Sequence, residues 1–203
     1  MSETVIWRGY HSKNIFELVR HTWNNDRLLI LHPPTVSTID YLSALPNYPI
    51  SFEGDWGSTP STNGTATSSP NFPDKPVLGL FSTGSTARKL VLYSKENVET
   101  SLKHILSLFD STQINRIFCY PQPFHTFGLT LGYVHSILTG RDLIFNDGPY
   151  NKLSHHQWIE NPEYRTLTLG TPTHFKDLIA FQQEKKITPG NTYSAIIGGA
   201  EVS

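Results

Sequence analysis

Residues 77–93 read VLGLFSTGSTARKLVLY, in which two apolar runs flank a loop of small hydroxyl residues that ends in a lysine. The runs Val77–Leu80 and Leu90–Tyr93 have the length and composition of β-strands, so the stretch predicts a β-hairpin with the loop at its tip. The loop hydroxyls are hydrogen-bond donors, Gly84 leaves the backbone open to an oxyanion, and Lys89 carries a positive charge. These properties predict a loop that binds the phosphates of a nucleoside triphosphate.

The loop is not a Walker A loop. That motif requires Gly-x-x-x-x-Gly-Lys-Ser/Thr running into a helix N-terminus, whereas the residues after Lys89 alternate and branch as in a strand. This spacing excludes a Walker-type kinase. The same composition also fits an ordinary Ser/Thr/Gly turn with an exposed lysine, so the rest of the chain must decide between the two interpretations.

The composition restricts the class of protein. A chain of 203 residues with a formal net charge of -1 can bury a sizeable core, and without a Lys/Arg run we expect no nucleic acid partner. The single cysteine, Cys119, lies in an apolar run and is expected to be a buried strand residue in a reducing compartment. No apolar segment is long enough for a membrane span and no secretory signal is recognisable, so we expect a cytoplasmic protein.

The chain divides into three predicted segments. Residues 1–53 form a predicted N-terminal segment. Helices are expected at Asn14–Trp23 and Ser37–Ala44, and a strand at Arg27–His32. Residues 54–75 are rich in Ser, Thr, Gly, Pro and Asn, which cannot bury enough apolar surface to order the segment well, so they predict a mobile loop. Residues 76–203 predict a regular α/β region.

Strands and helices alternate regularly after Pro76. Strands are expected at 77–82, 89–94, 116–121, 141–146, 165–170 and 194–198, and helices at Lys95–Phe109, His125–Leu138, Ser154–Glu160 and Thr173–Lys185. Apolar runs such as 143–145 and 195–197 predict strands that are covered on both faces. Repeated strand-helix-strand units predict the α/β class, with a mostly parallel β-sheet and flanking helices.

The least generic residues of the chain follow three of these strands. They are Pro121-Gln122-Pro123-Phe124-His125, Gly170-Thr171-Pro172-Thr173 and Gly198-Gly199-Ala200-Glu201. Because ligands of parallel sheets bind at the carboxyl ends of the strands, we expect these segments to meet at one site beside the hairpin loop.

Four segments resemble, in the right order, motifs of the adenylate-forming enzymes, which include the acyl-CoA synthetases, their relatives in nonribosomal peptide synthesis and the luciferases. Ser82–Lys89 is similar to the phosphate loop Thr-Ser-Gly-Thr-Thr-Gly-x-Pro-Lys, and residues 121–129 resemble the Leu-Pro-x-Phe-His-x-x-Gly segment. Gly170–Thr173 is similar to a Val-Pro-Thr helix start, and Gly198–Ala200 to a Gly-Gly-Ala turn. The resemblance covers about residues 76–203 and implies an incomplete N-terminal domain of the acyl-CoA synthetase-like fold.

The chain departs from the family pattern in two respects. The loop is one residue short and has Arg88 where proline is usual, which leaves open whether it still binds ATP. The sequence also stops at Ser203, before a Tyr-Gly-x-Thr-Glu segment, a ribose-binding aspartate and a C-terminal domain with the adenylation lysine. We expect either an excised N-terminal fragment or a naturally truncated descendant. The apolar sheet edges that truncation would expose predict a homodimer or poor solubility.

The resemblance implies roles for individual residues. Backbone N–H and hydroxyl groups of the loop would hold the β- and γ-phosphates, with Lys89 as the cation; these loop residues are Ser82, Thr83, Gly84, Ser85 and Thr86. His125 would be the catalytic residue, between the acyl carboxylate and the phosphates, as a neutral hydrogen-bond donor or a protonated cation. A histidine that only caps the following helix is the alternative.

Further residues are implied to contact the adenine or the acyl group. Gly198, Gly199 and Ala200 would let the backbone pack flat against both, with a plain turn as the alternative, and the acyl pocket would be bordered by Phe127, Thr130 and Thr171. The remaining histidines, including His155-His156, lack the spacing of a metal site and are expected at the surface.

The resemblance implies ATP-dependent activation of a carboxylic acid as an acyl-adenylate, followed by transfer to coenzyme A. The ligands would be a small carboxylic acid and a nucleotide, with ATP and coenzyme A as co-substrates and Mg²⁺ neutralising charge on the phosphates. The short N-terminus favours a member similar to the o-succinylbenzoate-CoA ligases of menaquinone synthesis. The alternative, from another functional class, is a noncatalytic nucleotide-binding or scaffold protein that is a remnant of the same fold. The altered loop favours this alternative.

Overall fold

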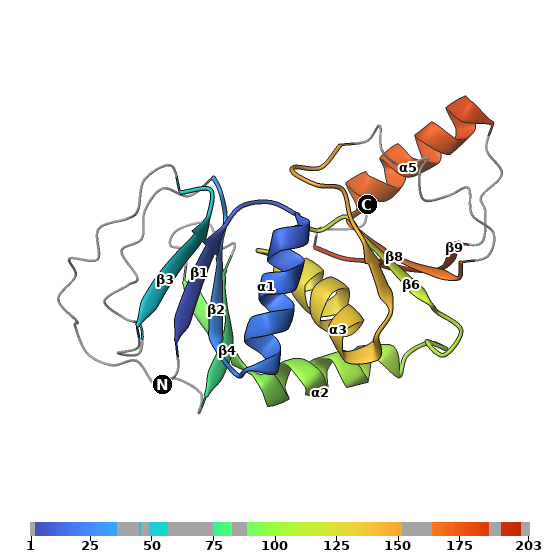
Figure 1. Cartoon of the computed structure of the whole chain (residues 1–203). Coiled ribbons are helices and arrows are strands. Elements are labelled where there is room, and N and C mark those ends of the chain that lie inside the picture. The colour runs from blue at the N-terminus through green and yellow to red at the C-terminus, as the bar shows by residue number, and fades with distance from the viewer. Residues whose placement is uncertain are drawn as a thin grey trace. The chain divides into compact units, whose positions relative to one another are not determined.

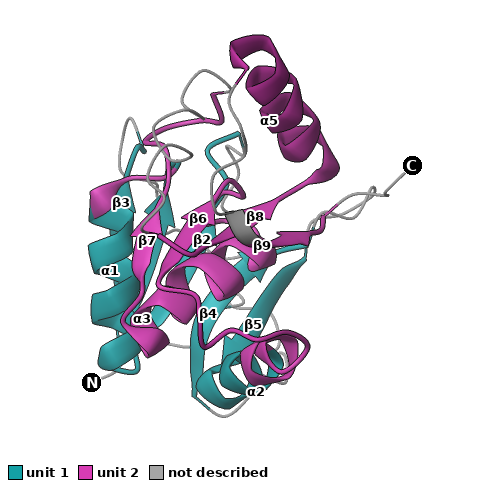
Figure 2. Ribbon diagram, turned by 90° about the vertical axis from the view of Figure 1, so that its right-hand side faces the viewer, with its two compact units in different colours: residues 1–10, 14–101 teal, residues 11–13, 102–203 magenta. Residues whose placement is uncertain are grey.

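The computed structural model describes residues 3–35, 45, 49–56, 75–82, 89–151, 164–186 and 192–199. The chain splits into unit 1, residues 1–10 with 14–101, and unit 2, residues 11–13 with 102–203, and each unit has its own β-sheet (Figure 2). The segment boundaries at residues 53 and 75 stay a prediction. In the described part of the chain, no helix has the length and apolar character that a membrane span needs.

The sheet of unit 1 has the strand order β3-β1-β2-β4-β5 (Figure 1). Its strands are β1 (Thr4–Arg8), β2 (Leu28–His32), β3 (Ile50–Gly54), β4 (Pro76–Phe81) and β5 (Leu90–Ser94). The first four run parallel, and β4 pairs with β5 as the predicted antiparallel hairpin, with Phe81 opposite Leu90. Strands β1 and β3 were not predicted from the sequence.

Two helices adjoin this sheet. Helix α1 (Lys13–Asn24) buries Ile15, Val19 and Trp23, a spacing of four residues that confirms the helix predicted there. Helix α2 (Lys95–Leu106) begins directly after β5. Its start is fixed by a reciprocal cap, in which Ser94 Oγ accepts from the Asn97 N–H (3.2 Å) and Asn97 Oδ1 accepts from the Ser94 N–H (3.4 Å).

The sheet of unit 2 is parallel, in the order β7-β6-β8-β9. Its strands are β6 (Arg116–Cys119), β7 (Asp142–Ile144), β8 (Thr166–Gly170) and β9 (Thr192–Ile197). The prediction that residues 143–145 and 195–197 are covered on both faces is wrong: residues 143–145 are half-buried, and Ile197 is 47% exposed. These residues lie in or next to the edge strands of the described sheet, whereas the inner strand β8 is buried throughout.

The predicted helix at 125–138 contains seven residues of π-helix, η2 (Gly128–Val134), which continues as α3 (His135–Thr139) and ends at Gly140 with φ 68°. A Cβ on Gly128 would lie 2.2 Å from Pro121 O, and one on Gly132 would lie 2.7 Å from Cys119 Sγ. The helix therefore packs directly on β6 and the turn after it. Helix α5 (Pro172–Lys185) follows β8. The helices expected at 37–44 and 154–160 lie outside the described residues.

The core of unit 2 lies between β6, β8, η2 and the last turns of α2. Its buried residues are Leu102, Ile114, Ile117, Cys119, Leu131, Leu167 and Leu169. Burial of Cys119 in β6 confirms the predicted buried strand position and raises the pKa of its thiol. The mostly parallel sheets with flanking helices confirm the α/β class.

Candidate functional site

Three of the predicted segments meet at the carboxyl ends of β6, β8 and β9. The Gly198 N–H donates to Gly170 O (3.1 Å). A Cβ on Gly198 would lie 3.6 Å from the Phe127 ring, and one on Gly199 would lie 3.7 Å from Thr171 Cγ2. The fold thus brings four predicted site residues together, Phe127, Thr171, Gly198 and Gly199, as expected for neighbouring parallel strands. Ala200 lies outside the described residues.

Thr171 forms the N-cap of α5. Its hydroxyl accepts from the His174 N–H (3.5 Å), and its own N–H donates to His174 Nδ1 (3.1 Å), so His174 completes a capping box. Pro172 occupies the first helical turn, where a missing N–H costs no hydrogen bond. This cap holds Thr171 at the end of β8, beside Gly199.

His125 begins the helix that contains η2. Its N–H donates to Gln122 O (3.1 Å), and its carbonyl accepts from the Leu129 N–H (2.9 Å). The residue is exposed, with its ring centroid 4.7 Å from that of Phe124. Desolvation by the surrounding atoms still lowers the pKa of His125 below its ordinary value. The imidazole is therefore neutral at neutral pH, with one ring nitrogen as donor and the other as acceptor.

Thr130 is not part of the group formed by Phe127, Thr171, Gly198 and Gly199. It is 8% exposed, in the middle of η2. Among the described contacts, none joins it to Thr171 or to the two glycines. Its predicted place at the border of an acyl pocket stays a prediction.

Ser82 and Lys89 close the base of the hairpin loop. The Ser82 N–H donates to Lys89 O (2.9 Å), and the Lys89 N–H donates to Ser82 Oγ (3.1 Å). This pairing fixes the two ends of the loop and leaves Lys89 exposed. Thr83, Gly84, Ser85 and Thr86 lie outside the described residues. Since the hairpin belongs to unit 1 and His125 to unit 2, their predicted proximity stays a prediction.

Sequence reasoning placed the remaining histidines at the surface, which is wrong for three of them. His11 is 3% exposed, and His32 and His135 are fully buried. The Tyr133 hydroxyl donates a hydrogen bond to His11 Nδ1 (2.8 Å), and His11 Nε2 lies 3.4 Å from Tyr120 O. Because a carbonyl only accepts, Nε2 carries the proton in this neutral tautomer.

His11 also fixes the turn that precedes His125. Its N–H donates to Gln122 Oε1 (3.0 Å), and Gln122 Nε2 in turn donates to Gly148 O (3.2 Å). Burial lowers the pKa of His11 to about 4, so the network holds an uncharged ring. No local sequence signal could reveal this role, since His11 and Gln122 are 111 residues apart.

An aromatic cluster beside Thr171 was also missed. The His174 ring lies 4.4 Å from that of Tyr150 and 5.1 Å from that of Tyr120. The Tyr150 hydroxyl donates to Asp177 Oδ2 (2.9 Å), and desolvation by burial raises the pKa of both tyrosines. The cluster lies at the carboxyl end of β6, next to the start of α5.

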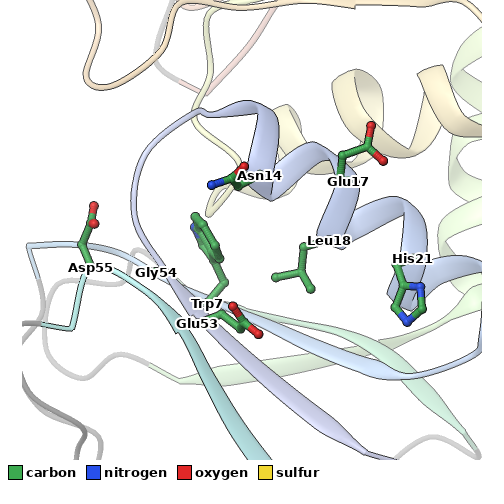
Figure 3. Close-up of a pocket in the computed structure, with 8 residues that line it drawn as sticks. All are labelled: Trp7, Asn14, Glu17, Leu18, His21, Glu53, Gly54 and Asp55. Atoms are coloured by element: carbon green, nitrogen blue, oxygen red, sulfur yellow. The ribbon is translucent and has the colours of Figure 1, made fainter.

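A surface hollow of about 530 Å³ lies on unit 1 (Figure 3). It is lined by Trp7, Asn14, Glu17, Leu18, His21, Glu53, Gly54 and Asp55. None of these is a predicted site residue, and three of them bear carboxylates that repel phosphates. The hollow is thus a poor nucleotide site. Among the described residues, no group of three or more His, Cys, Asp or Glu side chains could hold a metal ion.

Known proteins resemble this chain in sequence and in fold, although no family model matches it. The acyl-CoA ligase sidI of Aspergillus fumigatus is 27% identical over 123 residues, which are 60% of this chain and 21% of that protein. O-succinylbenzoate coenzyme A synthetase (MenE) from Bacillus subtilis, in complex with AMP, matches with a TM-score of 0.73 at 13% identity, over 98% of this chain and 55% of that chain. A malonyl-CoA ligase, in a ternary product complex with methylmalonyl-CoA and AMP, matches with a TM-score of 0.62 at 15% identity, over 90% and 42%.

The chain therefore spans about a fifth of the curated relative and about half of each of these solved structures. At such low identity the solved structures establish a shared fold, and the similarity to an acyl-CoA ligase points to the same group of proteins as the four motifs. Sequence and fold together support a relationship to the adenylate-forming acyl-CoA synthetases, and the partial coverage fits the N-terminal part of their fold.

Proposed function

We propose that this chain takes part in the ATP-dependent activation of a carboxylic acid as an acyl-adenylate, followed by transfer of the acyl group to coenzyme A. The observation that carries the proposal is the convergence of Phe127, Thr171, Gly198 and Gly199 at the carboxyl ends of three parallel strands. This is where parallel sheets bind their ligands. The relatives named above are acyl-CoA ligases or bind AMP, which supports the same chemistry.

The glycine turn suits a flat ligand. Gly199 has φ 80°, a conformation that disfavours side chains, and Gly198 faces the Phe127 ring without a Cβ. Without side chains in the way, the backbone of such a turn can approach a planar base closely. We infer that Gly198 and Gly199 bind the adenine or the acyl group between Phe127 and Thr171.

His125 would act on the incoming carboxylate. In its neutral form the imidazole can donate one hydrogen bond to a carboxylate or phosphate oxygen as charge moves from the acid to the phosphates. The turn before it is held by the hydrogen bond that the His11 N–H donates to Gln122 Oε1, so the backbone that carries His125 is restrained before a substrate arrives.

The hairpin would hold the phosphates. Its ends are fixed by the hydrogen bonds between Ser82 and Lys89, and the intervening hydroxyls and backbone N–H groups suit polyphosphate oxygens. When bound, Mg²⁺ would neutralise phosphate charge.

A more specific version of this proposal is that the protein prefers a substrate similar to that of the o-succinylbenzoate-CoA ligases. A noncatalytic remnant of the fold is the second candidate, favoured by the short loop with Arg88 in place of proline. A cytoplasmic location and a homodimer stay predictions.

Titration of the chain with ATP and Mg²⁺ tests the nucleotide site. Wild type should bind, and Lys89→Ala should bind at least about tenfold more weakly, because a charge-assisted contact to phosphate is lost. Lys103→Ala, which removes an exposed lysine of α2, is the matched control and should bind as wild type does. Equal binding by Lys89→Ala would refute the phosphate role of the loop.

Activity is tested with the longest form of the protein that the gene encodes. Exchange of radiolabelled pyrophosphate into ATP should depend on one member of a panel of carboxylic acids. Absence of exchange with the whole panel, together with retained ATP binding, would favour the noncatalytic remnant.

A further inference from the structure

The carboxyl edge of the unit 1 sheet carries a group of residues that the sequence did not single out. Arg8 ends β1, His32 ends β2, Trp56 follows β3 by two residues, and Phe81 ends β4. These strands are parallel, and Arg8 lies in register with both His32 and Gly54. The four side chains therefore gather at one edge of the sheet, where parallel sheets bind ligands.

A tight turn after β3 seats Trp56 against Arg8. Gly54 has φ 89°, and a Cβ on it would lie 2.2 Å from Arg8 O, so only glycine allows this approach. The Asp55 N–H donates to Arg8 O (2.8 Å), and Trp56 Nε1 donates to Glu53 O (2.8 Å). As a result the Arg8 guanidinium carbon lies 5.5 Å from the centre of the Trp56 ring.

Rings line the rest of this edge. The His32 ring centroid lies 5.3 Å from that of Trp56 and 5.4 Å from that of Phe81. His32 is fully buried, and its Nδ1 hydrogen-bonds Pro33 O (2.9 Å). Of these rings, that of Trp56 lies next to the Arg8 guanidinium, and an aromatic ring is a weaker partner for N–H donors than an oxygen acceptor.

The charge of Arg8 has no described counter-charge. The ion pairs among the described residues involve other cations, Arg20, Arg27, Lys95 and Lys185. Arg8 Nη2 donates to Pro34 O (2.8 Å), whereas its buried Nε has no hydrogen-bond partner in the described part of the chain. A guanidinium stays charged and offers five donors in a planar fork, so a half-buried one next to rings favours an oxyanion as partner.

We propose that Arg8, beside Trp56 and His32, forms an anion site that binds a carboxylate or phosphate group. The site is separate from the hairpin, since three strand spacings, about 14 Å, lie between β1 and β5 in the sheet. We therefore expect the group held by Arg8 to differ from a phosphate group held at Lys89. The inference stands on unit 1 alone and does not require that the protein activates an acid.

Binding of three probes, inorganic phosphate, pyrophosphate and benzoate, tests the site by calorimetry and by tryptophan fluorescence. Wild type should bind at least one probe, with a fluorescence change that the Trp56→Phe variant lacks. Arg8→Gln should bind at least about tenfold more weakly, because the charged fork is lost. Arg20→Gln, which removes an exposed arginine of α1, is the matched control and should equal wild type. If the protein binds phosphate but not benzoate, the ligand is a phosphate group. If it binds benzoate but not phosphate, the ligand is a carboxylate.

The proposal is overturned if wild type binds none of the probes, or if Arg8→Gln binds as wild type does. Should Arg8→Gln fail to fold, the Nε–H signal of Arg8 in ¹⁵N-labelled wild type must shift on addition of the bound probe, and an unchanged signal refutes the site. Lys89→Ala separates this site from the nucleotide loop. It should keep wild-type affinity at Arg8, and an equal loss in both variants would refute a separate site.

Discussion

Replacement of Gly128 by alanine should destabilise the turn that carries His125. The new Cβ would lie 2.2 Å from Pro121 O and 2.5 Å from Gln122 O, whereas real Cβ atoms essentially never approach a heavy atom closer than 3.0 Å. The helix or the turn must therefore move by roughly 0.8 Å or more, against backbone atoms that cannot rotate away.

The size of the effect follows from two opposing contributions. Overpacking against two backbone carbonyls should cost about 4 kcal/mol, slightly above the usual range because no flexible side chain can yield. Alanine in place of glycine favours the helix by about 1 kcal/mol. We therefore expect Gly128→Ala to lower the free energy of unfolding by about 3 kcal/mol.

Gly132→Ala is the matched control in the same helix. Its Cβ would lie 2.7 Å from Cys119 Sγ, a single side-chain atom, so a small shift should relieve the contact. Overpacking of about 1 kcal/mol and the helix preference of about 1 kcal/mol should nearly cancel. Urea denaturation followed by circular dichroism measures both variants. Equal stabilities of Gly128→Ala and Gly132→Ala would refute the reasoning.

Gly128→Ala should also affect His125. Gln122 O, which the new methyl group displaces, accepts the His125 N–H (3.1 Å). In a folded Gly128→Ala protein, the NMR pKa of the His125 ring should differ from that of wild type, because the desolvation that lowers it depends on this turn. An unchanged pKa would mean that the turn does not set the environment of His125.

Two further predictions concern the same unit. Burial holds the pKa of His11 at about 4, below the ordinary 6.5, so between these pH values the unfolded state binds a proton that the folded state does not. The stability that depends on neutral His11 is therefore complete above about pH 6.5 and falls by about 3 kcal/mol as the pH is lowered toward 4. Urea denaturation across this range should show wild type losing about 3 kcal/mol more than His11→Gln, and parallel curves would contradict the burial of a neutral ring. Thr171→Ala should lower stability by about 1 kcal/mol through loss of the N-cap of α5, while Thr171→Ser should stay close to wild type in thermal melts; equal losses in both would show that the hydroxyl cap is not the cause.

Much of the fold could be predicted because its signals are local. Alternating and branched residues on both sides of the loop at 82–89 predict the hairpin, and the spacing of Ile15, Val19 and Trp23 predicts α1. The convergence of the segments after β6, β8 and β9 also followed, since parallel strands bring their carboxyl ends to one edge. The strands β1 and β3, which pair with each other although they lie far apart in the chain, were missed.

The sequence by itself determined the α/β class, the hairpin and the residues that gather around Thr171 and Gly198. Only the tertiary structure decided that β7 and β9 are the edge strands of the described sheet, that His11 is buried against Gln122 and Tyr133, and that Arg8 lies on Trp56. The physical reason is that propensity and periodicity depend on neighbours within a few residues. Burial of a histidine or an arginine depends on residues far apart in the chain, whose approach leaves no local pattern.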